Sequence, residues 1–178
     1  MELSQAIQNR RSVRAFRAEP IACDQLKALI LEAAIWAPSG GNAQTWRFGL
    51  ITRPDLIGKI KMISPGILGQ PAAVIAICQD MEEARRKGSD LAVNALSWMD
   101  TAMAAQNLML AAHAAGIGTC AIASFHAKAV QKILGLPERI VPQLLVSLGY
   151  PSQSPQPPSR QTDVLWLNEY TERGALAE

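Results

Sequence analysis

Cysteine and histidine are scarce in this chain, and their spacing excludes the function classes that depend on them. The three cysteines, Cys23, Cys78 and Cys120, are far apart, and no Cys-x-x-Cys pair occurs. This pattern argues against a disulfide framework or a structural zinc site and favours a reducing compartment. His113 and His126 lack the spacing of metal ligands, so we expect core or surface roles for them and no metal site. Cys78 lies in an apolar run and is expected to be an inert core residue.

An excess of charge of one sign is also missing. Lys and Arg together number 17 and Asp and Glu 15, which gives a formal net charge of +2. That balance gives no reason to expect nucleic acid or a membrane surface as a partner. The first residues lack a basic stretch followed by an apolar core, so we expect no signal peptide and a cytoplasmic location.

The longest apolar stretch, residues 91–118, is not expected to cross a membrane. Asn94, Asp100, Gln106 and His113 interrupt it, and such groups are costly in a bilayer. The stretch therefore predicts a buried helix. A helix that is apolar on nearly every side must be covered by protein on most sides. In a chain of 178 residues this indicates a subunit interface.

The rest of the sequence predicts one domain of alternating helices and strands. Its length and its 49% of hydrophobic residues suit a single domain with a sizeable core. The segment 64–71 is expected to be a loop and 81–90 to be charged and exposed. Alternation of helices and strands, taken alone, favours a parallel sheet. Apolar periodicity with Pro and Gly boundaries predicts helices at 3–10, 24–37, 54–63, 91–116 and 127–134, and strands at 46–52, 73–78, 119–123 and 143–148.

A proline-rich segment follows the last strand. Pro151, Pro155, Pro157 and Pro158 fall within eight residues, which excludes regular structure and predicts an extended arm. The apolar residues 164–167 come after it. Apolar side chains are not expected on a free tail, so the arm must dock on its own core or on a partner chain.

Two short motifs near the N-terminus carry the strongest functional signal. Residues 10–14, Arg-Arg-Ser-Val-Arg, offer guanidinium groups and a hydroxyl that suit a phosphate. Residues 38–44, Pro-Ser-Gly-Gly-Asn-Ala-Gln, form a small-residue loop ending in amides that suit a hydrogen-bonding heterocycle. Each motif alone has a simpler interpretation, as cations at a helix C-terminus and as a helix-terminating loop. Together they predict one ligand with a phosphate at one end and a heterocycle at the other.

No nucleophilic or acid–base set accompanies these motifs. The sequence suggests no Ser/His/Asp or Cys/His arrangement, and Asp100 in the long helix is expected to serve a local hydrogen-bond network. Gly116-Ile117-Gly118-Thr119 is expected mainly to end that helix. An enzyme of this composition would take its reactivity from a cofactor.

Three segments in order resemble the nitroreductase family of FMN-dependent oxidoreductases. They are residues 10–16, 37–46 and 106–119, and the resemblance extends over about residues 3–170. It implies an α+β, nitroreductase-like fold with a central, mostly antiparallel sheet flanked by helices, in place of the parallel sheet that alternation favours. It also implies one FMN-binding domain over 1–178 and an intertwined homodimer with C-terminal arm exchange, in which residues 150–178 wrap the partner subunit.

The resemblance also implies a set of cofactor-binding residues. The first motif would hold the FMN phosphate, ribityl chain or flavin edge, the second would reach the flavin of the partner subunit, and a segment near residue 122 would lie beside the reactive edge of the flavin. A late arginine would close on the phosphate. The residues are Arg10, Arg11, Ser12 and Arg14; Pro38, Ser39, Gly40, Asn42 and Gln44; Ala121, Ile122, Ala123 and Ser124; and Arg160.

Several family features are absent. Many members carry an acidic residue where this chain has Ala123 or Ser124, and a second basic residue where it has Pro158. The chain also lacks a helical insertion that covers the pocket in longer members, so a more open or differently covered site is expected. No match within residues 64–70 can be assigned.

The implied activity is a ping-pong reaction in which NADH or NADPH passes hydride to flavin N5 and a small-molecule acceptor is then reduced. Nitroaromatics, quinones or related conjugated electrophiles would be the acceptors, and the flavin, not a side chain, would be catalytic. The same fold could instead support a dehydrogenase, a dehalogenase or a flavin-fragmenting enzyme. A non-catalytic flavin-binding or redox-sensing dimer is a further alternative. The arginine run alone would suit a nucleic-acid binder, but no aromatic residues are interleaved with it.

Overall fold

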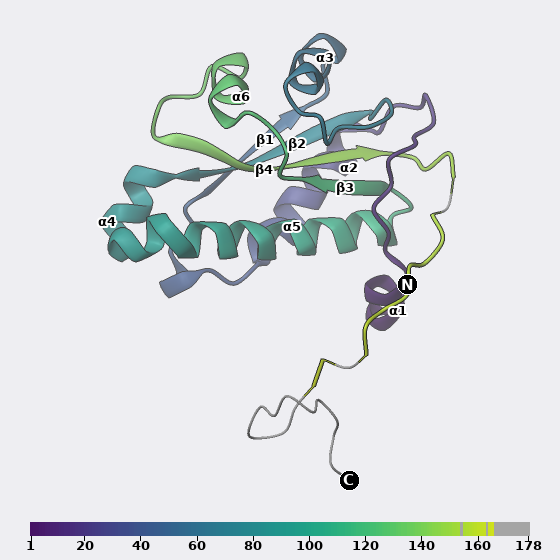
Figure 1. Ribbon diagram of the computed structural model, residues 1–178, viewed down its shortest axis with the longest axis horizontal. Coiled ribbons are helices and arrows are strands. Elements are labelled where there is room, and N and C mark those ends of the chain that lie inside the picture. Colours follow the sequence, from purple (N-terminus) through teal and green to yellow (C-terminus); the bar gives the residue numbers. More distant parts are fainter. Residues whose placement is uncertain (154, 163, 166–178) are drawn as a thin grey trace.

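The computed structural model describes residues 1–153, 155–162 and 164–165, and the expected helices and strands occur in the predicted order (Figure 1). The segment expected only to be charged and exposed forms a further helix, α4, whose first turn is capped by Asp80 accepting from the backbone N–H of Glu83 over 3.1 Å. In chain order the elements are α1 (Leu3–Asn9), α2 (Cys23–Ala28), β1 (Trp46–Ile51), α3 (Pro54–Met62), β2 (Ala73–Asp80), α4 (Met81–Leu91), α5 (Ser97–Ala114), β3 (Gly118–Ile122), α6 (Ala127–Ile133) and β4 (Ile140–Gly149).

The four strands form an antiparallel sheet in the order β1-β2-β4-β3. The α+β expectation is therefore confirmed, and the parallel sheet suggested by alternation is wrong. Between β1 and β2 the chain runs out along α3 and returns through residues 63–72. Ile51 consequently pairs with Val74, and β2 begins at the end of the sheet where β1 stopped.

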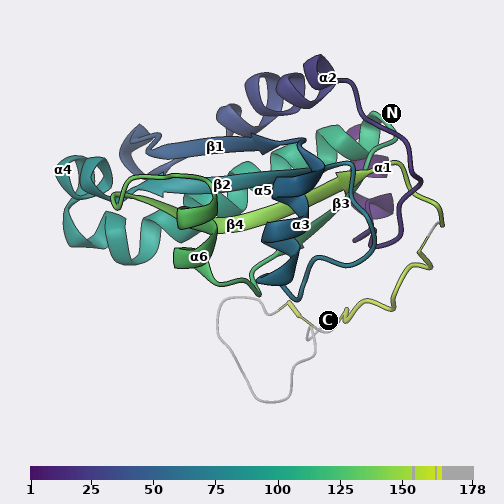
Figure 2. The ribbon, with the colours of Figure 1, turned by 90° about the horizontal axis from the view of Figure 1, so that it is seen from above.

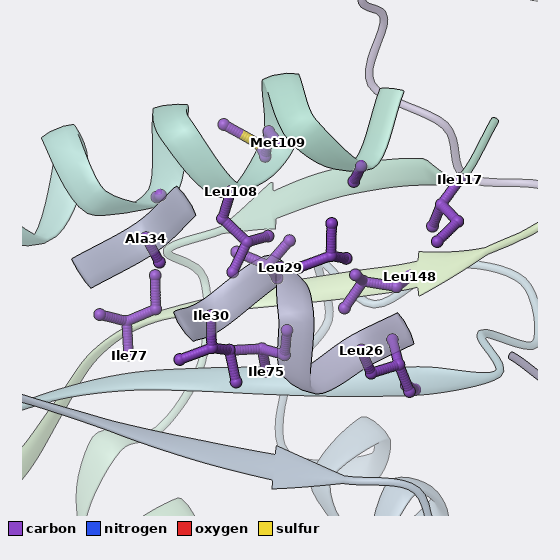
Figure 3. Close-up of a cluster of buried hydrophobic side chains, with 14 of the residues drawn as sticks. Leu26, Leu29, Ile30, Ala34, Ile75, Ile77, Leu108, Met109, Ile117 and Leu148 are labelled. Atoms are coloured by element: carbon purple, nitrogen blue, oxygen red, sulfur yellow. The ribbon is translucent and has the colours of Figure 1, made fainter. Parts of the chain in front are cut away.

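Helices cover both faces of the sheet. Helices α2 and α5 lie on one face and α3 and α6 on the other (Figures 1 and 2). Successive side chains of a strand point to opposite faces. Ile75 and Ile77 of β2 therefore enter the α2–α5 core (Figure 3), while Val74 and Cys78 enter the α3–α6 core. This explains why β2 reads as a continuous apolar run although the sheet is antiparallel.

Two predicted helices are less regular than their periodicity suggested. The helix expected over 24–37 is α-helical only to Ala28 and continues as a π-helical turn, Leu29–Ala33, and a 3-10 turn, Ala34–Trp36. The long helix α5 follows another π-helical turn, Ala92–Leu96. It ends at Ala114, and the glycine expected to stop it, Gly116, follows with a φ of 75°.

Strand β4 begins before the predicted 143–148. It includes Pro142, which pairs with Cys78 at a shift in the β2–β4 register. Proline has no N–H to donate to the sheet, and such an irregularity is where a strand tolerates it.

The described residues cover helix α5 on one side only. Asp100, Ala104 and Leu108 are buried, whereas Trp98 and Met99 are about half exposed, at 54% and 52%. The expected covering on most sides is therefore not provided by the described residues of one chain. Among those residues, no helix combines the length and apolar character needed to span a bilayer.

The segment after β4 first runs beside residues 15–16 and then leaves the domain. Ser152 donates its N–H to the Ala15 carbonyl over 3.1 Å, and Pro151 forms an isolated antiparallel β-bridge with Phe16. Residues 155–162 have no regular structure, as the prolines predict. Val164 and Leu165 are exposed, at 63% and 64%. The docking expected of residues 166 and 167 lies outside the described residues.

Candidate functional site

Residues 10–14, here called the arginine-rich motif, lie along the outer edge of β3, the last strand of the sheet. Val13 donates its N–H to the Thr119 carbonyl over 2.8 Å, and Ser12 forms a parallel bridge with Thr119. A Cβ on Gly118 would lie 2.8 Å from atoms of the Val13 side chain, so this close approach requires glycine. The turn at residues 116–119 therefore ends α5 and also provides the backbone on which the arginine-rich motif packs.

The loop 64–70, which the sequence did not place, forms a second wall of this region. A Cβ on Gly69, whose φ is 66°, would collide with the Arg14 carbonyl oxygen. A Cβ on Gly66 would collide with the Ser124 hydroxyl and would lie 2.7 Å from Ile122. Residues 10–14, 64–70 and 121–124 therefore meet at one place. The density of Pro and Gly in the loop was the only sequence signal for this packing.

The three arginines of the motif differ in what they contact. Arg11 closes α1, because its Nη1 donates to the carbonyl oxygens of Gln8 and Arg10 over 2.6 and 2.8 Å. The interpretation as a helix-end cation thus holds for Arg11. Within the described residues, neither the half-buried Arg10 nor the exposed Arg14 makes a side-chain hydrogen bond or ion pair. Their charges are available to an anion.

A cavity of about 330 Å³ opens beside Arg10 and Arg11. His113 and Thr119 line it, and their buried Nε2 and Oγ1 atoms have no hydrogen-bond partner in the described part of the chain. Burial, and then the charges of Arg10 and Arg11, lower the pKa of His113. The spacing of His113 predicted a core or surface role and gave no sign that it lines a cavity.

The segment 121–124 presents backbone and small side chains to the surface. Ala121, Ala123 and Ser124 are exposed, whereas the Ile122 side chain is 3% exposed and belongs to the α3–α6 core. Arg160 is exposed on the segment after β4. No hydrogen bond or ion pair within the described residues joins its side chain to the arginine-rich motif.

The amide-bearing loop 38–44 lies at the other end of α5. Gly40 donates its N–H to Asp100 Oδ1 over 3.1 Å, near the start of α5. His113, near the end of α5, lines the cavity beside Arg10 and Arg11. At 1.5 Å per residue the helix rises about 20 Å between Asp100 and His113. The two motifs predicted to serve one ligand are therefore not brought together within one chain.

Cys78 and His126 have structural roles. Burial raises the pKa of Cys78 to about 12, which agrees with the expected inert thiol. His126 caps α6 by accepting from the Ala129 N–H over 3.3 Å. Across the described residues, no group of three or more His, Cys, Asp or Glu side chains is arranged to hold a metal ion.

The chain is similar to known proteins of one family. The nitroreductase family model matches residues 7–65 and 59–150. A relative from Archaeoglobus fulgidus, provisionally named an NADH dehydrogenase/NAD(P)H nitroreductase, is 32% identical over 156 residues, covering 84% of this chain and 86% of its own. The NADPH-flavin oxidoreductase of Vibrio harveyi is 26% identical over 155 residues, covering 82% of this chain and 64% of its own.

Solved structures share the fold. One from Parabacteroides distasonis, provisionally named an NADH dehydrogenase/NAD(P)H nitroreductase, has a TM-score of 0.82 at 27% identity and covers 94% of this chain and 98% of its own. The family match includes the arginine-rich motif, the amide-bearing loop and residues 121–124. Because that match spans well over half of the sequence, the chain belongs to the nitroreductase family.

Proposed function

We propose that the protein is an FMN-dependent oxidoreductase that uses NADH or NADPH to reduce nitroaromatics, quinones or related conjugated electrophiles. Family membership supports an NAD(P)H-dependent oxidoreductase, and the name of the Vibrio harveyi relative supports a flavin. The observation that carries the proposal is the junction of residues 10–14, 64–70 and 121–124, held by the Val13–Thr119 hydrogen bond.

The residues at this junction suit a flavin mononucleotide. Arg10 and Arg14 have charges available for a phosphate, and Ser12 adds a hydroxyl. The exposed backbone at Ala123 and Ser124 offers hydrogen-bonding groups to a planar ring. Bound FMN would supply the redox chemistry, taking hydride from NAD(P)H and giving electrons to the acceptor.

The protein's own contribution is binding and positioning. The cations hold the phosphate end, the close-packed glycines at 66 and 69 let backbone approach, and the donors near residue 123 favour negative charge on the ring. No carboxylate stands at Ala123 or Ser124, and we assign no side chain as general acid or base.

We infer that the working site belongs to a homodimer. Because the two motifs lie at opposite ends of α5, Pro38, Ser39, Gly40, Asn42 and Gln44 would serve the flavin held mainly by the partner subunit. The exposed Trp98 and Met99 offer apolar surface for such an interface. Each subunit would be a single cytoplasmic domain over residues 1–178. Its arm, from about residue 150, would wrap the partner subunit and bring Arg160 to the FMN phosphate.

Absorbance spectroscopy tests this function directly. The purified protein is expected to be yellow, with stoichiometric FMN that bleaches in an anaerobic titration with NADH or NADPH and recovers with one of a panel of acceptors. A colourless protein that FMN cannot reconstitute contradicts the proposal. Oxygen-dependent loss of FMN would favour the flavin-fragmenting alternative, and NAD(P)H oxidation slower than flavin release would favour a redox-sensing dimer.

An arginine variant locates the site. Arg10→Ala is expected to weaken FMN binding about 10- to 100-fold, the range for one hydrogen bond to a charged group. Arg53→Ala is the matched control, because Arg53 is an exposed arginine paired with Asp55 at the start of α3. Equal FMN affinity of the Arg10 variant and the control would remove Arg10 from the site.

A further inference from the structure

Buried polar side chains gather beneath the amide-bearing loop 38–44. Gln79 of β2 donates to the Ser97 carbonyl and the Thr101 hydroxyl over 3.2 and 3.0 Å, and Thr45 donates to Gln79 Oε1 over 2.6 Å. Thr45, Gln79, Ser97 and Thr101 are each at most 2% exposed. Thr45 directly follows the loop, so this network fixes the loop's end to the sheet and to the first turns of α5.

Asp100 fixes the start of the same loop. Its side chain is buried, with the residue 4% exposed, and Oδ1 accepts from the Gly40 N–H over 3.1 Å. No cation forms an ion pair with Asp100 among the described residues. An unpaired buried carboxylate is costly to a fold, so its stabilising partner is the loop backbone.

The loop between these anchors has a demanding backbone. Gly41, Asn42 and Gln44 have positive φ values of 57°, 53° and 49°. Left-handed conformations are unfavourable for residues other than glycine and persist where the surroundings hold them. Lys87 also donates to the Ala43 carbonyl over 2.6 Å. Bonds within the loop also contribute, because Ser39 Oγ accepts from the Gln44 N–H over 3.1 Å and Asn42 Oδ1 accepts from Gln44 Nε2 over 2.9 Å. Among the described contacts of the loop with the rest of the fold, Asp100 supplies the one buried charge.

We propose that Asp100 is a positioning residue, which sets the conformation in which loop 38–44 reaches the flavin site of the partner subunit. The inference rests on the proposed function. The carboxylate touches neither cofactor nor substrate. It acts through the Gly40 N–H, so the acceptor oxygen is what the site requires.

Substitutions at Asp100 separate the acceptor from the charge. Asp100→Ala and Asp100→Leu both remove the acceptor, and the leucine also fills the space if the alanine variant does not fold. Each is expected to raise KM for NAD(P)H and for the acceptor about tenfold, with a smaller change in kcat, as loss of one hydrogen bond to a charged group predicts. Asp100→Asn keeps an acceptor oxygen and should restore KM to within about threefold. Asp55→Asn, at the exposed start of α3, is the matched control and should leave KM and kcat unchanged.

Hydrogen exchange at the Gly40 amide gives a readout that does not depend on activity. Exchange should accelerate in the alanine and leucine variants and stay near wild type in the asparagine variant. If exchange accelerates but KM is unchanged, or if Asp100→Asn behaves like Asp100→Ala in KM, the positioning role is overturned. If the wild-type protein neither binds FMN nor oxidises NAD(P)H, the proposed function fails instead, whatever the exchange data show.

Discussion

Val13 and Thr119 are joined by a backbone hydrogen bond of 2.8 Å, which attaches the arginine-rich motif to the edge of the sheet. The contact brings the two segments so close that Gly118 has no space for a Cβ. The position of Arg10 and Arg14 therefore depends on a glycine that carries no functional group.

Gly118→Ala is expected to destabilise the protein and loosen FMN. The new methyl would meet the branched Val13 side chain, which is stiff at χ1, and overpacking of this kind costs about 1–3 kcal/mol. The motif would move away from β3, so FMN affinity should fall together with the free energy of unfolding. Thermal unfolding and a fluorescence titration with FMN measure the two effects.

Gly58→Ala is the control for that experiment. Gly58 lies within α3, and a Cβ there meets nothing within 4 Å. Replacing a helical glycine by alanine should stabilise the protein by about 0.5–1 kcal/mol, with no change in FMN affinity. An unaltered FMN affinity in Gly118→Ala would show that the packing of the arginine-rich motif on β3 does not affect FMN binding.

The cavity histidine should report the charge of the arginines. Burial and then Arg10 and Arg11 lower the pKa of His113, so Arg10→Ala should raise that pKa. With two histidines in the chain, NMR titration of the ring protons can follow His113 directly. Arg53→Ala is again the control and should not move it. A His113 pKa that is the same in wild type and in Arg10→Ala would contradict the proximity of the two side chains.

Asp100 is expected to reduce stability at neutral pH. Burial raises its pKa, with the Gly40 hydrogen bond opposing, so the folded state holds the proton more tightly than the unfolded chain. The stability linked to this carboxyl is fully present below its unfolded pKa and is lost as pH rises through the raised folded value. Each unit of pKa difference corresponds to about 1.4 kcal/mol.

Asp100→Asn should therefore be more stable than wild type at pH 7, and the difference should shrink as pH falls into the ordinary carboxyl range. Urea unfolding at pH 7 and pH 4, at one protein concentration, measures it. A variant less stable than wild type at pH 7 would mean that the charged form of Asp100 stabilises the fold.

Local patterns in the sequence predicted most of the elements but not the sheet directions. Trp46, Phe48 and Leu50 alternate and mark β1 without contact information. Strand direction depends on the 63–72 return that pairs Ile51 with Val74, and no local pattern reveals that pairing. The resemblance to a family was needed to expect an antiparallel sheet. The π-helical turns before Ser97 and after Ala28 also left no trace in apolar periodicity.

For the candidate site too, local sequence predicted some features and not others. The motifs at 10–14 and 38–44 were visible because their chemistry is concentrated in consecutive residues. The residue pattern alone placed both motifs on one ligand, and only the family resemblance implied that loop 38–44 reaches the flavin of the partner subunit. No local pattern shows their separation along α5, because it depends on which helix end each motif contacts. The cavity position of His113 and the close packing at Gly66 were not predicted, since both depend on neighbours distant in sequence.

We propose that one flavin site takes the arginine-rich motif from one subunit and loop 38–44 from the other. Mixed dimers test it most directly. One chain carries Arg10→Ala with Arg14→Ala, the other carries Asn42→Ala with Gln44→Ala, and differently tagged heterodimers are purified and assayed for NAD(P)H oxidation with bound FMN. Each parent homodimer should be weak, and the heterodimer should recover activity, because one of its two sites combines both intact motifs. A heterodimer as inactive as its parents would show that each site takes both motifs from the same chain, and would contradict the account.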